Sequence, residues 1–388
     1  MNIEFYNCPS PEQFETKILP KEKPLFVEYR PDFALIDMIA REYGHYSNVL
    51  VIGHGGSVSA FAGIFGALKE QATKQAYILD TVDADYIHAL RQKLTPENTV
   101  VIACSKSGQT VTQLEALSSF MSFPLVCITE SASSLGQVAQ KMSARVVPHP
   151  PIGGRFTGLT EVALIPAALC GFDVAALYAG GAEVLRQYDG GGLAWKAASV
   201  LWQLEQKGYV DVFVPVYSKY LYALSELITQ LCHESFGKAG KGQTYVAAEA
   251  PESQHHMNQR FFGGRKNMAG WFISSGQRHG EDRTVFPTQV HRVVVRGRHA
   301  ADLSGVSLGN AMRAELEATM EDGRMRGIPL AHISLSSVSE KTLGACIAFF
   351  ELYAVYSSLL RDVDPFDQPQ VEASKELSLN KRLAVNGF

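Results

Sequence analysis

Two short loops in the first third of the chain carry residues suited to binding a phosphate group. The sequence GHGGS at 53–57 follows an apolar run at 48–52, and SKSGQT at 105–110 follows another at 99–103. Glycines let the backbone approach an anion, and a helix that begins after each loop would offer unbonded N–H groups. The second loop adds hydroxyls and a lysine, the donors that a phosphate monoester needs. The candidate phosphate ligands are Gly56, Ser57, Ser105, Lys106, Ser107 and Thr110.

Each loop also has an interpretation that needs no phosphate. The first could be a structural turn, or part of a dinucleotide-binding fingerprint, because Gly53, Gly55 and the later Asp80 occupy the expected places. Val58 stands at the third glycine position, however, which counts against that fingerprint. In the second loop, a hydroxyl group could simply cap the following helix. Two such loops after strands of one predicted sheet nevertheless favour a ligand site.

Farther along the chain, single polar residues could perform acid–base and electrostatic chemistry. Glu234 lies four residues after Gln230, so the two share one face of a predicted helix. A carboxylate there could move protons, although a lone glutamate is commonly a solvated surface residue. Arg155 follows two glycines in a predicted loop and could stabilise developing negative charge. The histidine pair at 255–256 could titrate near neutral pH, or could simply pack.

The sequence predicts no metal site. His233 and Glu234 begin like an HExxH zinc helix, but position 237 is a glycine. The histidines at 255–256 have no carboxylate or cysteine ligand at a recognisable spacing. We therefore expect neither a metal ion nor an organic cofactor.

An alternation of short apolar runs and helix-like segments must position these residues. Short apolar runs separated by helices are typical of parallel strands that are buried on both faces. The pattern occurs twice, which predicts two doubly wound α/β layers with mainly parallel sheets flanked by helices. Helices are predicted at 58–69, over most of 160–207, and at 342–360, where the pattern indicates a long amphipathic helix. The strand candidates are 48–52, 76–79, 99–103, 124–129, 210–214, 244–248, 271–273, 290–295 and 330–335.

The domain boundaries follow from this repetition. We expect an N-terminal extension at 1–30, a first α/β domain at 31–180, a second at 181–362, and a polar C-terminal tail at 363–388. A chain of 388 residues is in accord with two domains.

The composition of the chain limits the kinds of partner that the protein is expected to bind and the cellular compartment in which it is expected to work. The formal net charge of -4 indicates no basic surface for nucleic acid or for a membrane. The most apolar stretch, 162–179, contains Pro166, Gly171 and Asp173, which favours a buried helical hairpin over a membrane span. The six cysteines form no CxxC pair, and the first residues lack the apolar segment of a secretion signal. We expect a soluble cytoplasmic protein that binds a small molecule.

Five segments, in order along the chain, resemble a known family. The loop SKSGQT at 105–110 resembles the phosphate loop of sugar isomerase (SIS) domains. The other four are similar to phosphoglucose isomerases in particular. They are GGRFT at 153–157, HESFGK at 233–238, SQHH at 253–256 with Gln259, and FDQ at 366–368 followed by VEASK at 371–375. The resemblance implies two SIS-type domains and the aldose–ketose isomerisation of glucose 6-phosphate and fructose 6-phosphate.

The resemblance also implies roles for the matching residues. Glu234 would be the base that moves a proton between C1 and C2, and Arg155 would face the enediolate oxygens. His255 and Lys375 would assist the opening of the sugar ring, with the tail that carries Lys375 folded back over the site. The family forms dimers in which a histidine from one subunit completes the other's site, which implies a homodimer with His255 donated across the interface. Further sugar contacts would come from Gly154, Gln230 and Gln368.

The chain departs from the family pattern near two of these motifs. GQT at 108–110 stands where longer members have an aromatic residue and two threonines, and Gln113 and Leu114 occupy the place of an acid. Cys232 and His233 replace the asparagine and glutamine that usually precede the glutamate. These departures bear on specificity and efficiency more than on the type of reaction.

Two other functions stay open at this point. A bifunctional phosphoglucose/phosphomannose isomerase would use the same enediol, although Gln254 next to His255 favours the glucose-specific branch. A non-catalytic SIS-type sensor would need the phosphate loops but not the base. Such sensors usually carry a helix-turn-helix that binds DNA, and neither end of this chain has a basic module.

Overall fold

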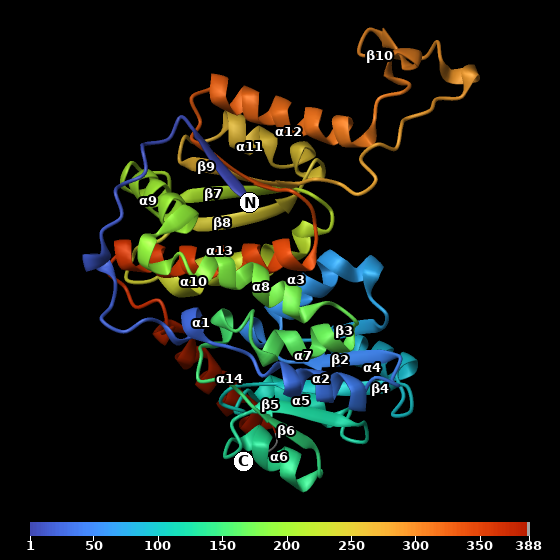
Figure 1. The fold of residues 1–388 in the computed structure, drawn as a ribbon, viewed down its shortest axis with the longest axis vertical. Helices are drawn as coiled ribbons and strands as arrows, with labels where there is room; N and C mark the ends of the chain where they lie inside the picture. The colour runs from blue at the N-terminus through green and yellow to red at the C-terminus, as the bar shows by residue number, and fades with distance from the viewer. Residues whose placement is uncertain (386–388) are drawn as a thin grey trace.

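The first half of the chain forms a five-stranded, wholly parallel sheet in the order β3-β2-β4-β5-β6. The computed structural model describes residues 1–385 (Figure 1). The sheet order reverses at β2, which has β3 on one side and β4 on the other. The carboxyl ends of β2 and β4 therefore form a topological switch point, where sheets of this kind bind ligands. The strands are β2 (Asn48–Ile52), β3 (Gln75–Leu79), β4 (Thr99–Cys104), β5 (Leu125–Thr129) and β6 (Arg145–Pro148).

The second half forms another five-stranded sheet in the order β1-β12-β9-β7-β8. Its four strands β12, β9, β7 and β8 are parallel, so the predicted pair of doubly wound α/β layers is confirmed. Their bounds are β7 (Asp211–Tyr217), β8 (Thr244–Glu249), β9 (Met268–Ser275) and β12 (Leu330–Leu335).

The N-terminal residues add a strand that sequence analysis missed. β1 (Asn2–Tyr6) pairs antiparallel with β12, from Asn2 opposite Ser334 to Tyr6 opposite Leu330. Residues 2–6 of the predicted N-terminal extension therefore belong to the second sheet. The expected boundary at residue 180 falls within α8 (Val174–Leu185), and the division into domains stays a prediction.

A layer of helices joins the two sheets. α8 and α9 (Gly192–Gln206) pack along α13 (Glu340–Leu360), and a single apolar core runs from β2 through these helices to β7. α13 is buried along nearly its whole length, so the prediction of an amphipathic helix is wrong: it packs against α8, α9 and α10 (Ser225–Phe236), and its aromatic residues contact Trp271 of the second sheet. α13 is also the one helix within residues 1–385 that is long and apolar enough to cross a membrane, and 83% of its apolar window is buried inside the protein.

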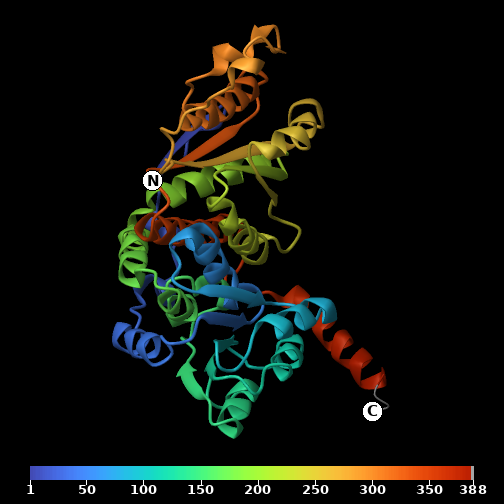
Figure 2. The same ribbon diagram turned by 90° about the vertical axis from the view of Figure 1, so that its right-hand side faces the viewer.

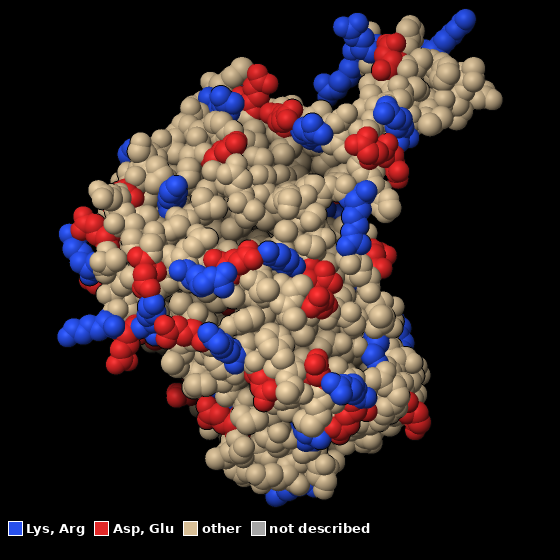
Figure 3. Space-filling view, in the orientation of Figure 1, with Lys and Arg blue, Asp and Glu red and all other residues tan. Residues whose placement is uncertain are grey.

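The predicted strand at 290–295 forms only at its last two residues, outside the second sheet. Residues 276–307 leave the body as an exposed arm that holds two short 3-10 helices, Thr288–Val290 and Ala300–Leu303, and a hairpin of β10 (Val294–Val295) with β11 (Arg298–His299) (Figure 1). The valines of β10 are exposed because no other element packs on them. The space-filling view shows positive and negative side chains interspersed over this face of the molecule (Figure 3).

The other helices flank the sheets, apart from the last, which projects from the body (Figure 2). The predicted hairpin at 162–179 is two buried helices that turn at Gly171, where φ is +89°. The bounds are α1 (Leu25–Glu28), α2 (Phe33–Glu42), α3 (Ser59–Leu68), α4 (Ala84–Lys93), α5 (Val111–Ser118), α6 (Ser134–Lys141), α7 (Glu161–Leu169), α10 (Ser225–Phe236), α11 (Asn258–Gly263), α12 (Leu308–Met325) and α14 (Glu372–Val385).

Candidate active site

Both predicted phosphate loops lie at the switch point of the first sheet. The loop at 53–57 follows β2, and the loop at 105–110 follows β4, the strand hydrogen-bonded beside it. His54 Nε2 lies 3.0 Å from Thr112 Oγ1 in the first turn of α5, so the first loop contacts the helix that the second loop opens. The two loops therefore share one edge of the sheet, as a common anion site requires.

The second loop is held by its own hydroxyls. Ser105 Oγ accepts from the Gly108 N–H at 3.1 Å, and Ser107 Oγ accepts from the Gln109 N–H at 3.4 Å. Gly108 has φ +62°, and a Cβ there would lie 2.4 Å from Ser133 Oγ, so only glycine fits. Thr110 is the N-cap residue of α5, but its side chain makes no capping bond. The simple capping interpretation therefore does not account for its hydroxyl.

Buried Gln113 joins the strands that carry these loops. Its side-chain amide donates to the carbonyl of Ile52 at 3.0 Å and to that of Cys104 at 2.8 Å. These carbonyls belong to the last residues of β2 and β4. Gln113 thus sets the separation of the two loops, a role that its place in the sequence did not indicate.

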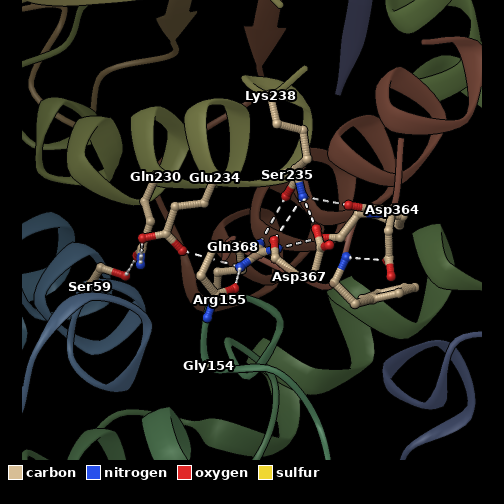
Figure 4. Close-up of polar contacts among 12 residues, drawn as sticks. Ser59, Gly154, Arg155, Gln230, Glu234, Ser235, Lys238, Asp364, Asp367 and Gln368 are labelled. Carbon is tan, nitrogen blue, oxygen red and sulfur yellow. Dashed lines mark hydrogen bonds and ion pairs between the residues drawn. The ribbon is translucent and has the colours of Figure 1, made fainter. Parts of the chain in front are cut away.

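Arg155 is the centre of the polar cluster in Figure 4. It lies in a short 3-10 helix after β6 and is only 4% exposed. Nε donates to Ser235 Oγ at 3.0 Å, and Nη1 donates to Glu234 Oε2 at 3.2 Å and to Gln368 Oε1 at 2.7 Å. Nη2 donates to the carbonyls of Pro365 and Asp367. Burial lowers the pKa of Arg155, and the nearby Glu234 carboxylate opposes that effect.

Glu234 is held at both carboxylate oxygens. Oε2 accepts from Arg155, and Oε1 accepts from Gln230 Nε2 at 3.1 Å across one turn of α10. Gln230 Oε1 in turn accepts from Ser59 Oγ at 2.9 Å, which ties α10 to α3 (Figure 4). The Glu234 side chain remains 37% exposed, so a ligand can reach it.

The first phosphate loop touches this cluster directly. A Cβ at Gly56 would lie 2.2 Å from the Arg155 backbone nitrogen and 2.2 Å from the Gly154 carbonyl carbon, so only glycine allows this approach. Thr157 Oγ1 donates to the Gly154 carbonyl at 2.7 Å and also lies 3.3 Å from the Gly56 carbonyl. The candidate phosphate loop and the Arg155–Glu234 pair therefore border one site.

A segment of the C-terminal tail closes one side of the site. Lys238 Nζ donates to the carbonyl of Asp367 at 2.7 Å and to its carboxylate, and also to the carbonyl of Asp364. These bonds hold the segment that places Gln368 against Arg155, and a contact of Gln368 with the sugar stays a prediction. Ser59, Ser235, Lys238 and Asp367 were not predicted as functional residues; Ser235, Lys238 and Asp367 lie inside quoted motifs, whereas Ser59 has no signal in the sequence.

The structure does not bring His255 or Lys375 to this cluster. His255 is exposed in a shallow pocket of about 520 Å³ with Gln254, Asn258 and Arg326. Lys375 pairs at 2.6 Å with Glu372, the first residue of α14, and its side chain is 62% exposed. Their roles therefore stay predictions. Within residues 1–385, no three histidine, cysteine, aspartate or glutamate side chains gather as a metal ion would need.

The family model of phosphoglucose isomerase matches residues 39–385. The chain belongs to the phosphoglucose isomerase family. It is 28% identical over 345 residues to a probable glucose-6-phosphate isomerase of Haloquadratum walsbyi, covering 84% of this chain and 77% of that one. It is 27% identical over 333 residues to the glucose-6-phosphate isomerase of Rubrobacter xylanophilus, covering 81% and 76%.

Solved structures share this fold. A hypothetical protein from Thermus thermophilus has a TM-score of 0.81 at 29% identity, over 93% of this chain and 89% of that one. A glucose-6-phosphate isomerase from Chlamydia trachomatis has a TM-score of 0.74 over 99% and 82%, and at 18% identity this likeness speaks for the fold alone.

Replacing Gln113 with leucine tests whether stability and substrate binding depend on the hydrogen bonds of Gln113 to β2 and β4. Leucine fills the space but leaves the carbonyls of Ile52 and Cys104 without their donor, so we expect a loss of about 1–3 kcal/mol in the free energy of unfolding and a higher KM. Urea unfolding and steady-state kinetics measure both. Gln140→Leu, at an exposed site on α6, should change stability by less than about 0.5 kcal/mol. Equal effects of the two substitutions would contradict a bridging role.

The contact and burial of His233, one of the residues that depart from the family pattern, lead us to expect that stability depends on pH. Its Nε2 accepts from the Tyr245 N–H at 2.9 Å, which only the neutral ring can do. Burial lowers the pKa of His233, so the unfolded chain binds more protons than the folded one. Its contribution is present above pH about 6.5 and is lost as the pH falls through the pKa of the folded state.

The measurement for His233 is urea unfolding at pH 5.5 and 7.5. His233→Gln keeps an acceptor for the Tyr245 N–H but does not titrate, so its free energy of unfolding should fall less than the wild type's. Identical falls in the two proteins would show that His233 does not couple to folding.

Proposed function

We propose that this protein is a glucose-6-phosphate isomerase, which interconverts glucose 6-phosphate and fructose 6-phosphate. The observation that carries the proposal is the contact of 3.2 Å between a carboxylate, Glu234, and a buried guanidinium, Arg155, which borders a glycine loop at the switch point of the first sheet. This reaction needs one group that moves a proton and another that stabilises the resulting negative charge. We also propose that the enzyme works in the cytoplasm, since all six cysteines are unpaired.

The substrate phosphate would bind at the two loops after β2 and β4. The N-terminus of α5 and the backbone of the first loop supply N–H groups, and Lys106 supplies a positive charge. The hydroxyls come from Ser57, Ser105, Ser107 and Thr110, with Gly56 allowing the backbone to approach. Anchoring the phosphate here would leave C1 and C2 of the sugar for the Glu234 side of the site.

Glu234 would carry the proton. In the forward direction its carboxylate takes the proton from C2 of the open-chain aldose, and the electrons of that C–H bond form the C1–C2 double bond of an enediolate. The hydroxyl proton on O2 passes to O1, and the same carboxyl group returns a proton to C1, which leaves a carbonyl at C2 and produces the ketose. Gln230 and Arg155 each hold one carboxylate oxygen, so the group is oriented before substrate arrives.

Arg155 would stabilise the enediolate oxygens. An arginine has five N–H donors, and in this structure the Arg155 guanidinium has five acceptors. A substrate oxygen must therefore take over one of these donors. The Nη1 bonds to Glu234 and Gln368 are the candidates, because both partners are side chains that can move, whereas the carbonyls on Nη2 belong to the backbone.

Ring opening would use His255 and Lys375. We propose a homodimer in which His255 of one subunit reaches the site of the other, which is in accord with its exposure and its distance from its own Arg155 cluster. Mixed dimers of Glu234→Gln and His255→Ala subunits test this. Each parent has two defective sites, but a mixed dimer with shared sites has one intact site, so we expect activity to return. If re-formed heterodimers stay as inactive as the parents, the histidine is not shared.

Proton NMR in deuterium oxide is the direct test of the reaction. The purified protein is incubated with fructose 6-phosphate without added metal, and glucose 6-phosphate carrying deuterium at C2 is the expected product. Additional mannose 6-phosphate would assign the bifunctional activity instead. Saturable binding with neither product nor exchange would refute catalysis and favour a sugar-phosphate sensor.

A further inference from the structure

His54 is a histidine that neither the motifs nor the mechanism uses, although it lies between the two phosphate loops. It follows β2 at the second position of the first loop and is half-buried. Its Nε2 lies 3.0 Å from Thr112 Oγ1. Thr112 is the second residue of α5, the helix whose N-terminus faces the proposed phosphate. The imidazole is therefore one hydroxyl group away from that anion site.

We propose that His54 is a phosphate-responsive positioning residue, whose protonation orients the Thr112 hydroxyl toward the bound phosphate dianion. This inference deepens the proposed function, since it takes the two loops as the phosphate site. It gives this chain an affinity for its anionic substrate that depends on pH.

The protonation state of the imidazole decides the direction of the Thr112 hydroxyl proton. A neutral imidazole can either donate to or accept from the Thr112 hydroxyl, so the hydroxyl proton has two alternative directions. A doubly protonated imidazolium can only donate. Thr112 Oγ1 must then accept from Nε2, and its own proton becomes available for a phosphate oxygen. The imidazolium also brings a positive charge close to the dianion.

Burial and a neighbouring carboxylate shift the pKa of His54 in opposite directions. Burial lowers its pKa, and Asp80, which follows β3, partly offsets this effect. Burial and the charge of Asp80 both raise the pKa of Glu226 on α10. Lys106 is a charged residue of the neighbouring loop after β4. Burial therefore favours the neutral ring, and a dianion at the N-terminus of α5 adds the negative charge that favours the imidazolium. Anion binding and proton uptake then strengthen one another by the same factor.

Sulfate is the probe for this linkage, because it stays a dianion over the pH range in which histidine titrates. We expect the inhibition constant of sulfate against fructose 6-phosphate to rise about tenfold between pH 6 and pH 8 in the wild type. His54→Gln keeps a donor that reaches Thr112 but does not titrate, so its inhibition constant should change less than about twofold. His45→Gln is the matched control, because His45 is exposed at the opposite edge of the same sheet, and it should behave as the wild type.

Equal pH slopes in wild type and His54→Gln would overturn the proposal. NMR titration of the histidine side chains provides a second readout that needs no turnover: sulfate should raise the pKa of His54. Failure of isomerisation in deuterium oxide would refute the proposed function, yet a sulfate-dependent pKa of His54 would still support the phosphate-responsive histidine. An unchanged pKa of His54 in saturating sulfate would refute it even in an active isomerase.

Discussion

Replacing Glu234 with glutamine should lower kcat by about 10²–10⁴, the usual contribution of a general base. Glutamine has the same shape and keeps an oxygen that can accept from Gln230 or Arg155, but it cannot take up the C2 proton. The side chain is 37% exposed, so we expect little change in the free energy of unfolding. Steady-state kinetics with fructose 6-phosphate, together with urea unfolding, separate the two effects.

The matched control for this prediction is Glu226→Gln. Glu226 lies two turns earlier on the same helix and makes no contact with Arg155 among the described residues. Its substitution should leave kcat within about twofold, as is usual for a surface position. Near-normal turnover in Glu234→Gln would remove Glu234 from the role of base, whatever the control does.

Replacing Arg155 with lysine should lower kcat by about 10²–10³, comparable to the loss of one oxyanion-hole donor. Lysine keeps the positive charge, but its ammonium cannot reproduce the fork of five N–H donors that Arg155 directs at α10 and at the tail. The substitution also leaves buried acceptors unpaired, so stability should fall by about 1–3 kcal/mol. The loss in kcat should remain at temperatures where the variant is fully folded.

Arg145→Lys is the control for this second prediction. Arg145 begins β6, the strand that precedes Arg155, and pairs with Glu42 at the surface, and exposed ion pairs contribute only about 0–1 kcal/mol. We expect neither kcat nor stability to change appreciably. If Arg155→Lys retained wild-type kcat while losing stability, the role of Arg155 would be structural. Another group would then have to stabilise the enediolate oxygens.

Local patterns in the sequence determined the strands that form the two sheets. Continuous apolar runs such as 48–52 and 99–103 match β2 and β4 because a central parallel strand is buried on both faces and needs no polar residue. The same reasoning failed for β1, whose sequence NIEFY alternates and lies at a sheet edge. Nothing within residues 2–6 shows that their partner is β12, since that pairing depends on packing between distant segments.

The chemistry of the site divides in the same way. Residue types and motif order can be read from the sequence alone: glycines in the phosphate loop, a glutamate one helical turn after a glutamine, and an arginine beside two glycines. The folded structure is needed to show that Ser235, Gln368 and the carbonyls of the tail accept hydrogen bonds from Arg155. It is also needed to show that Gln113 joins β2 to β4. The strength of each such hydrogen bond depends on burial and geometry, and these arise from elements far apart in the chain. Spacing along the sequence therefore indicates the chemistry, whereas the fold decides which groups carry it out together.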